Sequence, residues 1–241
     1  MKHISLAVLF SLAGIATAHA QSAGQWVFNA GWMHFAPQDS SQLLSVSALG
    51  SSTTVPGSGA TVSNADTFAF TATYFVTDHV AVETLLGVPP KLTLSGTGSL
   101  SSLGELGSAR VWSPVILAQY HFGEPTARLR PYVGAGVGYV SFKSIKLNDR
   151  VATGQLLASP SFGTSLEGPT SASLSNSFAP IINAGLAYNL DKHWSVGLSA
   201  SYVWLSTRAT LTTRAPAGVV SSTTKLKLNP IVTFASLGYR F

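Results

Sequence analysis

The chain has 241 residues, of which 46% are hydrophobic and only 10% are charged, and its mean hydropathy is +0.30. A soluble domain usually has about 25% charged residues, so this composition argues against an ordinary soluble protein. The net charge of +5 comes from 14 basic and 9 acidic residues that form no Lys/Arg run, so we expect no nucleic-acid binding. The lack of cysteine excludes disulfides, thiolate metal sites and a cysteine nucleophile.

The first twenty residues have the three parts of a secretory signal. Lys2 and His3 form a short basic start, residues 4–15 are apolar, and Ala18-His19-Ala20 is an A-x-A cleavage site. The apolar stretch is too short to cross a bilayer as a helix, which needs about 20 residues. We therefore expect residues 1–20 to be a signal peptide and the mature protein to span residues 21–241.

The last residues of the chain alternate between two unlike faces, which indicates a β-strand. One face is mostly apolar and consists of Ile231, Thr233, Ala235, Leu237, Tyr239 and Phe241. No segment after the signal is long and apolar enough for a transmembrane helix. A closed barrel is the remaining way to place so apolar a chain in a bilayer, because it satisfies every backbone group between strands. The sequence thus predicts an all-β fold, an eight-stranded antiparallel transmembrane β-barrel.

Eight alternating segments support this prediction, joined alternately by short turns and long outer loops. The expected strands are residues 26–36, 66–76, 80–94, 110–122, 130–144, 178–190, 194–213 and 223–241. The expected outer loops are residues 37–64, 96–109, 145–177 and 214–222. Aromatic residues near strand ends, such as Trp26, Tyr74, Trp194 and Tyr239, are typical of an interfacial girdle. Eight strands leave room for side chains or one small ligand, which excludes an open porin.

Several motifs, taken together, resemble the OmpW family of small outer-membrane barrels, which includes alkane-uptake proteins. They are Tyr74-x-x-Thr77-Asp78, Val82-Glu83, Pro89, Pro114-x-x-x-Ala118-Gln119-Tyr120-x-Phe122-Gly123, Arg130-Pro131-Tyr132-Val133-Gly134-Ala135-Gly136 and the stretch from Asn229 to Phe241. The resemblance spans essentially the whole mature chain. It implies a location in the cell outer membrane and passive uptake of small hydrophobic molecules. It also implies that Phe241, with Tyr239, is an assembly signal read by the barrel assembly machinery. The long first loop and the serine-rich third loop depart from the family pattern, so family roles are not carried over to them.

The inward-facing residues differ with depth in the barrel. An apolar path in the outer half is predicted from Met33, Phe35, Val115, Leu117, Val203, Leu205, Val232 and Phe234. A polar plug at the periplasmic end is predicted from Asn29, Glu83, Gln119, His121, Arg130 and Arg240. Because an unpaired charge in a narrow lumen is costly, we expect Glu83 and Arg240 to pair, directly or through Gln119, His121 or Arg130. The alternative is that both layers only fill the barrel.

Three prolines predict where a molecule could leave the barrel. A proline has no N–H and so interrupts the hydrogen bonds between strands. Pro89 and Pro90 lie near the outer end of the third expected strand, and Pro114 lies near the outer end of the fourth. We expect a lateral exit between these strands. The alternative is that the prolines merely end strands at the loop boundary.

No motif points to an enzyme, a metal site or a cofactor. The run Gly134-Ala-Gly136-Val-Gly138 lacks the G-x-G-x-x-G spacing, and there is no G-x-S-x-G elbow. A lipid-modifying enzyme that used His121 or His193 with a nearby serine is the less favoured alternative. A structural or adhesive barrel that works through its loops is the other alternative. The expected partners are outer-membrane lipid, lipopolysaccharide, the assembly machinery and a small hydrophobic ligand.

Overall fold

A computed structural model describes residues 22–48, 51–157 and 166–241 of the chain. The expected signal peptide, residues 1–20, lies outside the described residues. No helix in the described part of the chain is long and apolar enough to cross a membrane.

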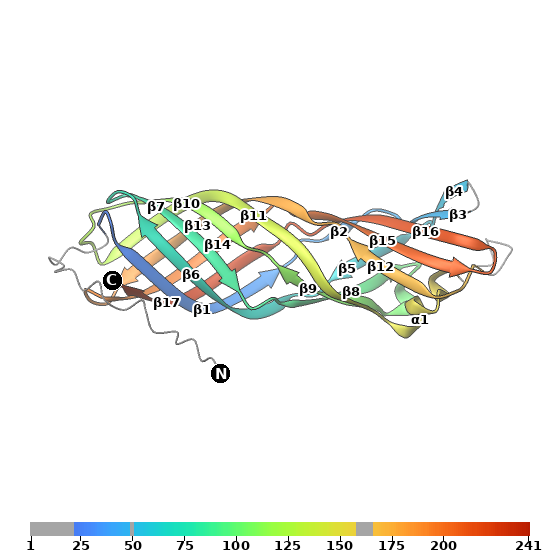
Figure 1. Cartoon of the computed structure of the whole chain (residues 1–241). Coiled ribbons are helices and arrows are strands. Elements are labelled where there is room, and N and C mark those ends of the chain that lie inside the picture. Colours follow the sequence, from blue (N-terminus) through green and yellow to red (C-terminus); the bar gives the residue numbers. More distant parts are fainter. Residues whose placement is uncertain (1–21, 49–50, 158–165) are drawn as a thin grey trace, which may run out of the picture.

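Eight antiparallel strands form a closed ring (Figure 1), which confirms the predicted fold. In ring order they are β1 (Trp26–Ala36), β6 (Ala65–Phe75), β7 (Val80–Gly87), β10 (Val115–His121), β11 (Leu129–Leu147), β13 (Ser177–Asn189), β14 (Trp194–Val203) and β17 (Ile231–Arg240). The first strand pairs with the last over ten residues of each, from Val27 opposite Arg240 to Ala36 opposite Ile231. Strand β1 begins and β17 ends at one end of the ring, which we call the base.

Side chains alternate between the two faces of the ring as the sequence predicts. In β10 every odd-numbered residue is buried and every even-numbered residue is exposed. A strand places successive side chains on opposite faces, so the exposed apolar residues form an outward belt. Aromatic residues lie at both ends of this belt. Those near the base include Trp26, Tyr74, Tyr120 and Trp194, and those toward the far end include Trp32, Phe68, Trp112, Tyr139, Phe178 and Trp204.

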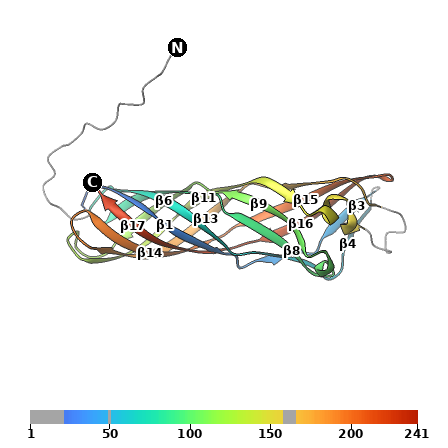
Figure 2. The ribbon, with the colours of Figure 1, turned by 90° about the horizontal axis from the view of Figure 1, so that it is seen from below.

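Beyond the ring, the strands continue as two further sheets, which we call the outer extension (Figures 1 and 2). One sheet consists of β5 (Ser58–Val62), β8 (Lys91–Gly98), β9 (Glu105–Trp112) and the far half of β11. The other consists of β12 (Thr170–Leu174), β15 (Ser206–Ala215), β16 (Gly218–Lys227), β3 (Ser45–Ala48) and β4 (Ser51–Thr54), with β2 (Ser40–Ser41) also paired to β16. Three short helices lie in the connections of the outer extension: η1 (Ser101–Leu103) between β8 and β9, and α1 (Asp149–Ala152) and η2 (Gln155–Leu157) between β11 and β12.

The outer extension corrects the prediction of four long outer loops. Residues 37–64, 96–109, 145–177 and 214–222 all contain parts of strands. Their Ser, Thr and Gly residues suggested loops, but threonine fits a pleated strand well. Partners distant in the sequence, such as β16 and β3, supply the hydrogen bonds that make these segments regular.

The turns at the base are short and held by their own side chains. In the turn between β13 and β14, one carboxylate oxygen of Asp191 accepts hydrogen bonds from the backbone N–H groups of His193 and Trp194, both at 2.7 Å. These bonds favour the charged form, so the Asp191 pKa lies below its ordinary value. Short bonded turns of this kind fix the register of the strands that they join.

Candidate functional site

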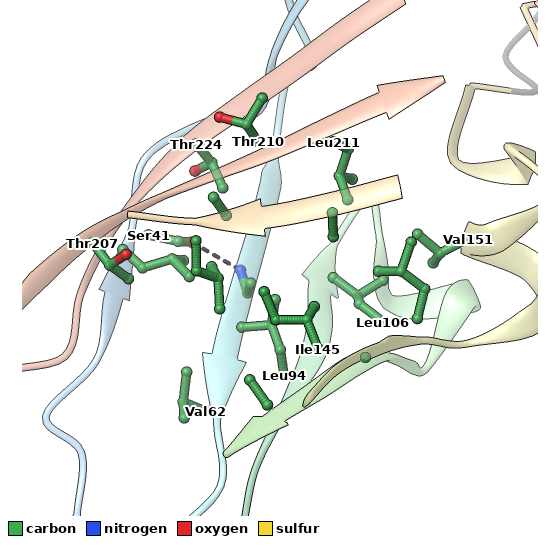
Figure 3. Close-up of a pocket in the computed structure, with 18 of the residues that line it drawn as sticks. Ser41, Val62, Leu94, Leu106, Ile145, Val151, Thr207, Thr210, Leu211 and Thr224 are labelled. Atoms are coloured by element: carbon green, nitrogen blue, oxygen red, sulfur yellow. Dashed lines mark hydrogen bonds between the residues drawn. The ribbon is translucent and has the colours of Figure 1, made fainter. Parts of the chain in front are cut away.

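The outer extension encloses a cavity whose empty volume is about 1040 Å³, including open solvent at its mouth. Strands of both outer sheets supply its walls, and Figure 3 shows side chains converging on it from several of them. The lining is dominated by aliphatic side chains, among them Leu44, Val62, Leu92, Leu94, Leu100, Leu106, Ile145, Leu211, Leu226 and Leu228. Its chemistry is therefore that of a site for apolar molecules.

Alternation within the outer strands produces this lining. In β16, Leu226 is buried at the cavity while Lys225 and Lys227 on either side are exposed. In β8, Leu92 and Leu94 face the cavity while Lys91 is exposed. The period-two pattern of the ring thus extends beyond it and keeps the apolar face turned inward.

Polar groups in the cavity wall are mostly satisfied by the backbone. The Ser41 hydroxyl accepts a bond of 2.8 Å from Ala60 N–H, which is the dashed line in Figure 3. The Ser58 hydroxyl accepts from Leu44 N–H and donates to the Val55 carbonyl, both at 2.7 Å. These serine hydroxyls stabilise the wall by bonding its backbone, so few free donors or acceptors remain for a ligand.

The residues of the predicted apolar path lie in the ring rather than in the wall of this cavity. Val115, Leu117, Val203 and Leu205 are buried in one cluster, against which Phe35 and Val232 pack. Met33 and Phe234 are buried in a second cluster with Ala69. The structure therefore brings the eight residues together as packed side chains in two clusters. Sequence reasoning missed the cavity because much of its lining comes from segments expected to be loops, such as those of Leu44, Leu100 and Leu106. The alternation in β8 and β16 is a signal that could have found it.

Near the base, all six predicted plug residues have polar partners, and Glu83, Gln119 and His121 form one network. The Glu83 carboxylate accepts bonds from the Thr73 hydroxyl at 2.8 Å and from the Gln119 amide at 3.0 Å. The other end of the Gln119 amide accepts a bond of 3.1 Å from Nε2 of His121. Asn29 donates to the Thr71 hydroxyl at 2.8 Å. This network surrounds a small polar cavity with an empty volume of about 480 Å³.

Among the described residues, Glu83 and Arg240 do not form the direct pair, which was one of the two expected arrangements. Arg240 donates to the Asn189 side chain at 2.7 Å and to the Lys192 carbonyl at 3.1 Å. Glu83 has uncharged partners instead. The physical reason is that Arg240 ends its strand, where oxygen atoms of the β13–β14 turn lie within reach. Arg130 is fully buried and also donates to turn backbone, at the Asp78 carbonyl. The guanidinium groups of Arg130 and Arg240 thus stabilise turns at the base of the ring by hydrogen bonds to their carbonyl oxygens.

The three predicted exit prolines lie at one seam of the wall. Pairing of β7 with β10 extends to Leu85 opposite Val115, and pairing of β8 with β9 begins at Lys91 opposite Arg110. Between these pairs, residues 86–90 and 111–114 have no register partners across the seam. One backbone bond crosses there, from Val111 N–H to the Pro90 carbonyl at 3.0 Å. We call this interrupted stretch the proline seam.

The described residues offer little for the enzyme alternative. The His121 ring lies between those of Phe75 and Tyr132, each with its centroid 4.8 Å away. Within the described ranges, its side-chain hydrogen bond goes to Gln119 and no serine hydroxyl is bonded to it. The same ranges hold no group of three or more His, Cys, Asp or Glu residues that could bind a metal ion.

Known proteins resemble this chain over most of its length. The chain is 30% identical to outer membrane protein W of Vibrio cholerae over 238 residues, which cover 98% of this chain and 97% of that protein. It is 28% identical to outer membrane protein AlkL of Ectopseudomonas oleovorans, with 78% of this chain and 71% of that protein covered. The crystal structure of OprG from Pseudomonas aeruginosa superposes with a TM-score of 0.78 at 25% identity, covering 92% of this chain and 98% of that one.

The family comparison agrees with the closed ring, the outward apolar belt and the motifs quoted from the sequence. The family model described as the OmpW family matches residues 22–241. The chain therefore belongs to the OmpW family and is a β-barrel of the outer membrane.

Proposed function

We propose that this protein is a passive route by which small hydrophobic molecules enter the outer membrane. The observation that carries the proposal is the aliphatic cavity of the outer extension. A concave apolar site of several hundred Å³ with few free polar groups suits an apolar ligand of that class. Such a molecule is driven from water into the cavity by the area it buries, at roughly 25 cal/mol per Å².

The direction of travel follows from what lies beneath the cavity. In the proposal, the two packed clusters and the hydrogen-bonded network below them are what close the axis of the ring. An apolar molecule gains nothing by crossing a layer of buried polar groups, whose hydrogen bonds it cannot replace. In the proposal the cargo therefore leaves sideways, into the outer leaflet, and the polar layer acts as a plug.

The proline seam is the proposed exit. Leu92 and Ala109 line the cavity, and each is adjacent in sequence to a member of the Lys91–Arg110 pair that bounds the seam. The cavity and the interrupted ladder thus share the strands β8 and β9. Opening the wall there breaks fewer interstrand bonds than opening it along any stretch with complete pairing.

A reversible staple tests this route. The chain has no cysteine, so Gly87→Cys with Ser113→Cys would form a unique disulfide across the seam. A side chain at Gly87 has room, because its nearest neighbouring atom would be 3.5 Å away. In liposomes, uptake of an apolar fluorescent probe should stop under oxidation and return after reduction.

The matched control is a staple between Thr84→Cys and Ile116→Cys, which are opposite each other where the same two strands pair fully. This staple should leave uptake unchanged in both redox states. Equal uptake by the oxidised and reduced seam variant would contradict the lateral exit. A complete lack of probe uptake by the unmodified barrel would contradict the transport function itself and favour a structural or adhesive role.

A further inference from the structure

Three exposed basic residues lie side by side on the outward face of the first outer sheet. Lys91 on β8 is the register partner of Arg110 on β9, and Arg110 is in turn the partner of Lys143 on β11. Register partners point to the same face, with their Cβ atoms about 5 Å apart. The three cations therefore form one row across three adjacent strands, which we call the basic row.

The basic row is unfavourable for the protein by itself. Like charges directly opposite each other on neighbouring strands destabilise a sheet. Among the residues that the structure describes, none of the three has a carboxylate within ion-pair distance, and the one ion pair joins His34 to Asp66. Arg110 makes one bond, from its guanidinium to the Pro89 carbonyl at 3.1 Å. Three cations held together without a counter-charge offer a place where an anion from outside the chain can bind.

The position of the row along the strands identifies the level of the membrane that it faces. Trp112, exposed on the same face of β9, lies two residues from Arg110 toward the ring. Tyr139 lies four residues from Lys143 on β11. Exposed Trp and Tyr side chains mark the boundary between the hydrocarbon and the headgroups. The basic row therefore lies just outside that boundary, at headgroup level.

We propose that the basic row is a binding site for the phosphate groups of a bisphosphorylated lipid of the outer leaflet, lipid A. The guanidinium of Arg110 can bond a phosphate through two parallel N–H groups, and the two lysines add point charges on either side. The acyl chains of the same lipid would lie on the apolar belt beneath the row, where Ile116 and Val137 are exposed. A soluble phosphate lacks this second contact. Lys91 and Arg110 also bound the proline seam, so the test below measures lipid binding and not uptake.

Titration of the reconstituted barrel tests the proposal. Barrels in nanodiscs of a zwitterionic phospholipid are titrated with bisphosphorylated lipid A, and the bound lipid is counted by native mass spectrometry. The triple variant Lys91→Gln, Arg110→Gln, Lys143→Gln should bind about tenfold more weakly, since three exposed charge contacts are lost. Lipid A from which both phosphates have been removed should bind equally to the native and triple-variant barrels.

A second triple variant removes the same amount of charge elsewhere. Arg128→Gln, Lys192→Gln and Arg214→Gln change exposed residues outside the row, and this variant should keep its affinity within about twofold. Equal affinity of the two triple variants would overturn the proposal. The proposal would also be overturned if the native barrel bound dephosphorylated and phosphorylated lipid A with equal affinity.

Two further measurements test the proposal without comparing the lipid affinities of the variants. Binding to the native barrel should weaken steeply between roughly 0.05 and 0.5 M NaCl, because salt screens exposed charges. Binding that is indifferent to salt would contradict phosphate recognition. In lipid-free detergent, the basic-row variant should resist urea at least as well as the native barrel, because mutual repulsion is removed. A loss of urea resistance greater than that of an Arg110→Gln single variant, which loses only the bond to the Pro89 carbonyl, would show that the row as a whole supports the fold and not a ligand.

Discussion

One amide, that of Gln119, joins Glu83 to His121. Its nitrogen donates to the Glu83 carboxylate at 3.0 Å, and its oxygen accepts from the imidazole at 3.1 Å. Since an amide has a donor end and an acceptor end, this connection fixes which nitrogen of His121 carries the proton. The carboxylate and the imidazole are thereby held in one buried network with no charged partner between them.

The network predicts the effect of changing Glu83. Replacement by alanine leaves the Thr73 hydroxyl and the Gln119 amide without their acceptor, and each unsatisfied buried group costs about 1–3 kcal/mol. Glu83→Ala should therefore lower the free energy of unfolding measured by urea titration in lipid or detergent. Glu83→Gln keeps an acceptor oxygen and should be much less destabilised. Equal urea midpoints for the native and Glu83→Ala barrels would contradict the structural role of the network.

Filling the cavity should reduce uptake without affecting the ring. Ala109 lies in the cavity wall, so Ala109→Phe would occupy space that the proposed cargo needs. Uptake of an apolar probe should fall about tenfold, which corresponds to about 1.4 kcal/mol of lost binding. Thr93→Phe, on β8 and outside the cavity lining, is the matched control and should retain uptake. Full uptake by the cavity variant would place the route of the cargo elsewhere.

Deleting Phe241 should reduce assembly of the protein in the cell while leaving the stability of the folded barrel nearly unchanged. The Phe241 ring touches Phe28 and Tyr239, but 65% of the residue is exposed. Its loss should therefore change the urea midpoint of barrels refolded in detergent only slightly. In cells, the amount of folded protein in the outer membrane should drop several-fold, because the assembly machinery would lack the signal that the family resemblance implies. An unchanged cellular yield would refute the role of Phe241 in assembly.

Gly136 should be intolerant of any side chain. A Cβ atom there would overlap the Ile116 carbonyl oxygen on the paired strand β10. Gly136→Ala must therefore push β10 and β11 apart, at a cost on the order of 1–3 kcal/mol, which is measurable as a lower urea midpoint. Gly87→Ala, whose nearest neighbour would be 3.5 Å away, is the control. If both alanine variants were equally stable, the two strands could not approach as closely as described.

The ring was predictable because alternation is a local property of each strand. Val115 to His121 alternates between buried and exposed at every residue, and that pattern is readable without knowing any partner. The inward position of Glu83 follows from the same rule. The outer extension as a whole was not predictable, because its second sheet is completed by pairing of β3 with β16 across more than half of the chain. Serine and threonine suit both a loop and a paired strand, so composition alone favoured the wrong one.

The partners of polar side chains were the least predictable feature of the base. Depth along the strands predicted only a level for Glu83 and Arg240, near the base of the lumen, and gave no prediction of how each side chain is oriented. Arg240 has a long side chain that reaches the turn at Asn189 and Lys192. A period-two pattern specifies a face of the sheet and gives no information about where a flexible guanidinium turns on that face.

The pairing of β1 with β17 has a consequence for how the chain reaches its folded state. Asn29 lies opposite Gly238, so the first and last strands meet across nearly the entire sequence. Contacts of such long sequence separation are slow to form. Until the last ten residues are in place, the sheet has two open edges whose unpaired N–H and C=O groups can join another chain. A chain cut short by one strand therefore presents two edges prone to aggregation, and the final strand removes both by pairing with the first.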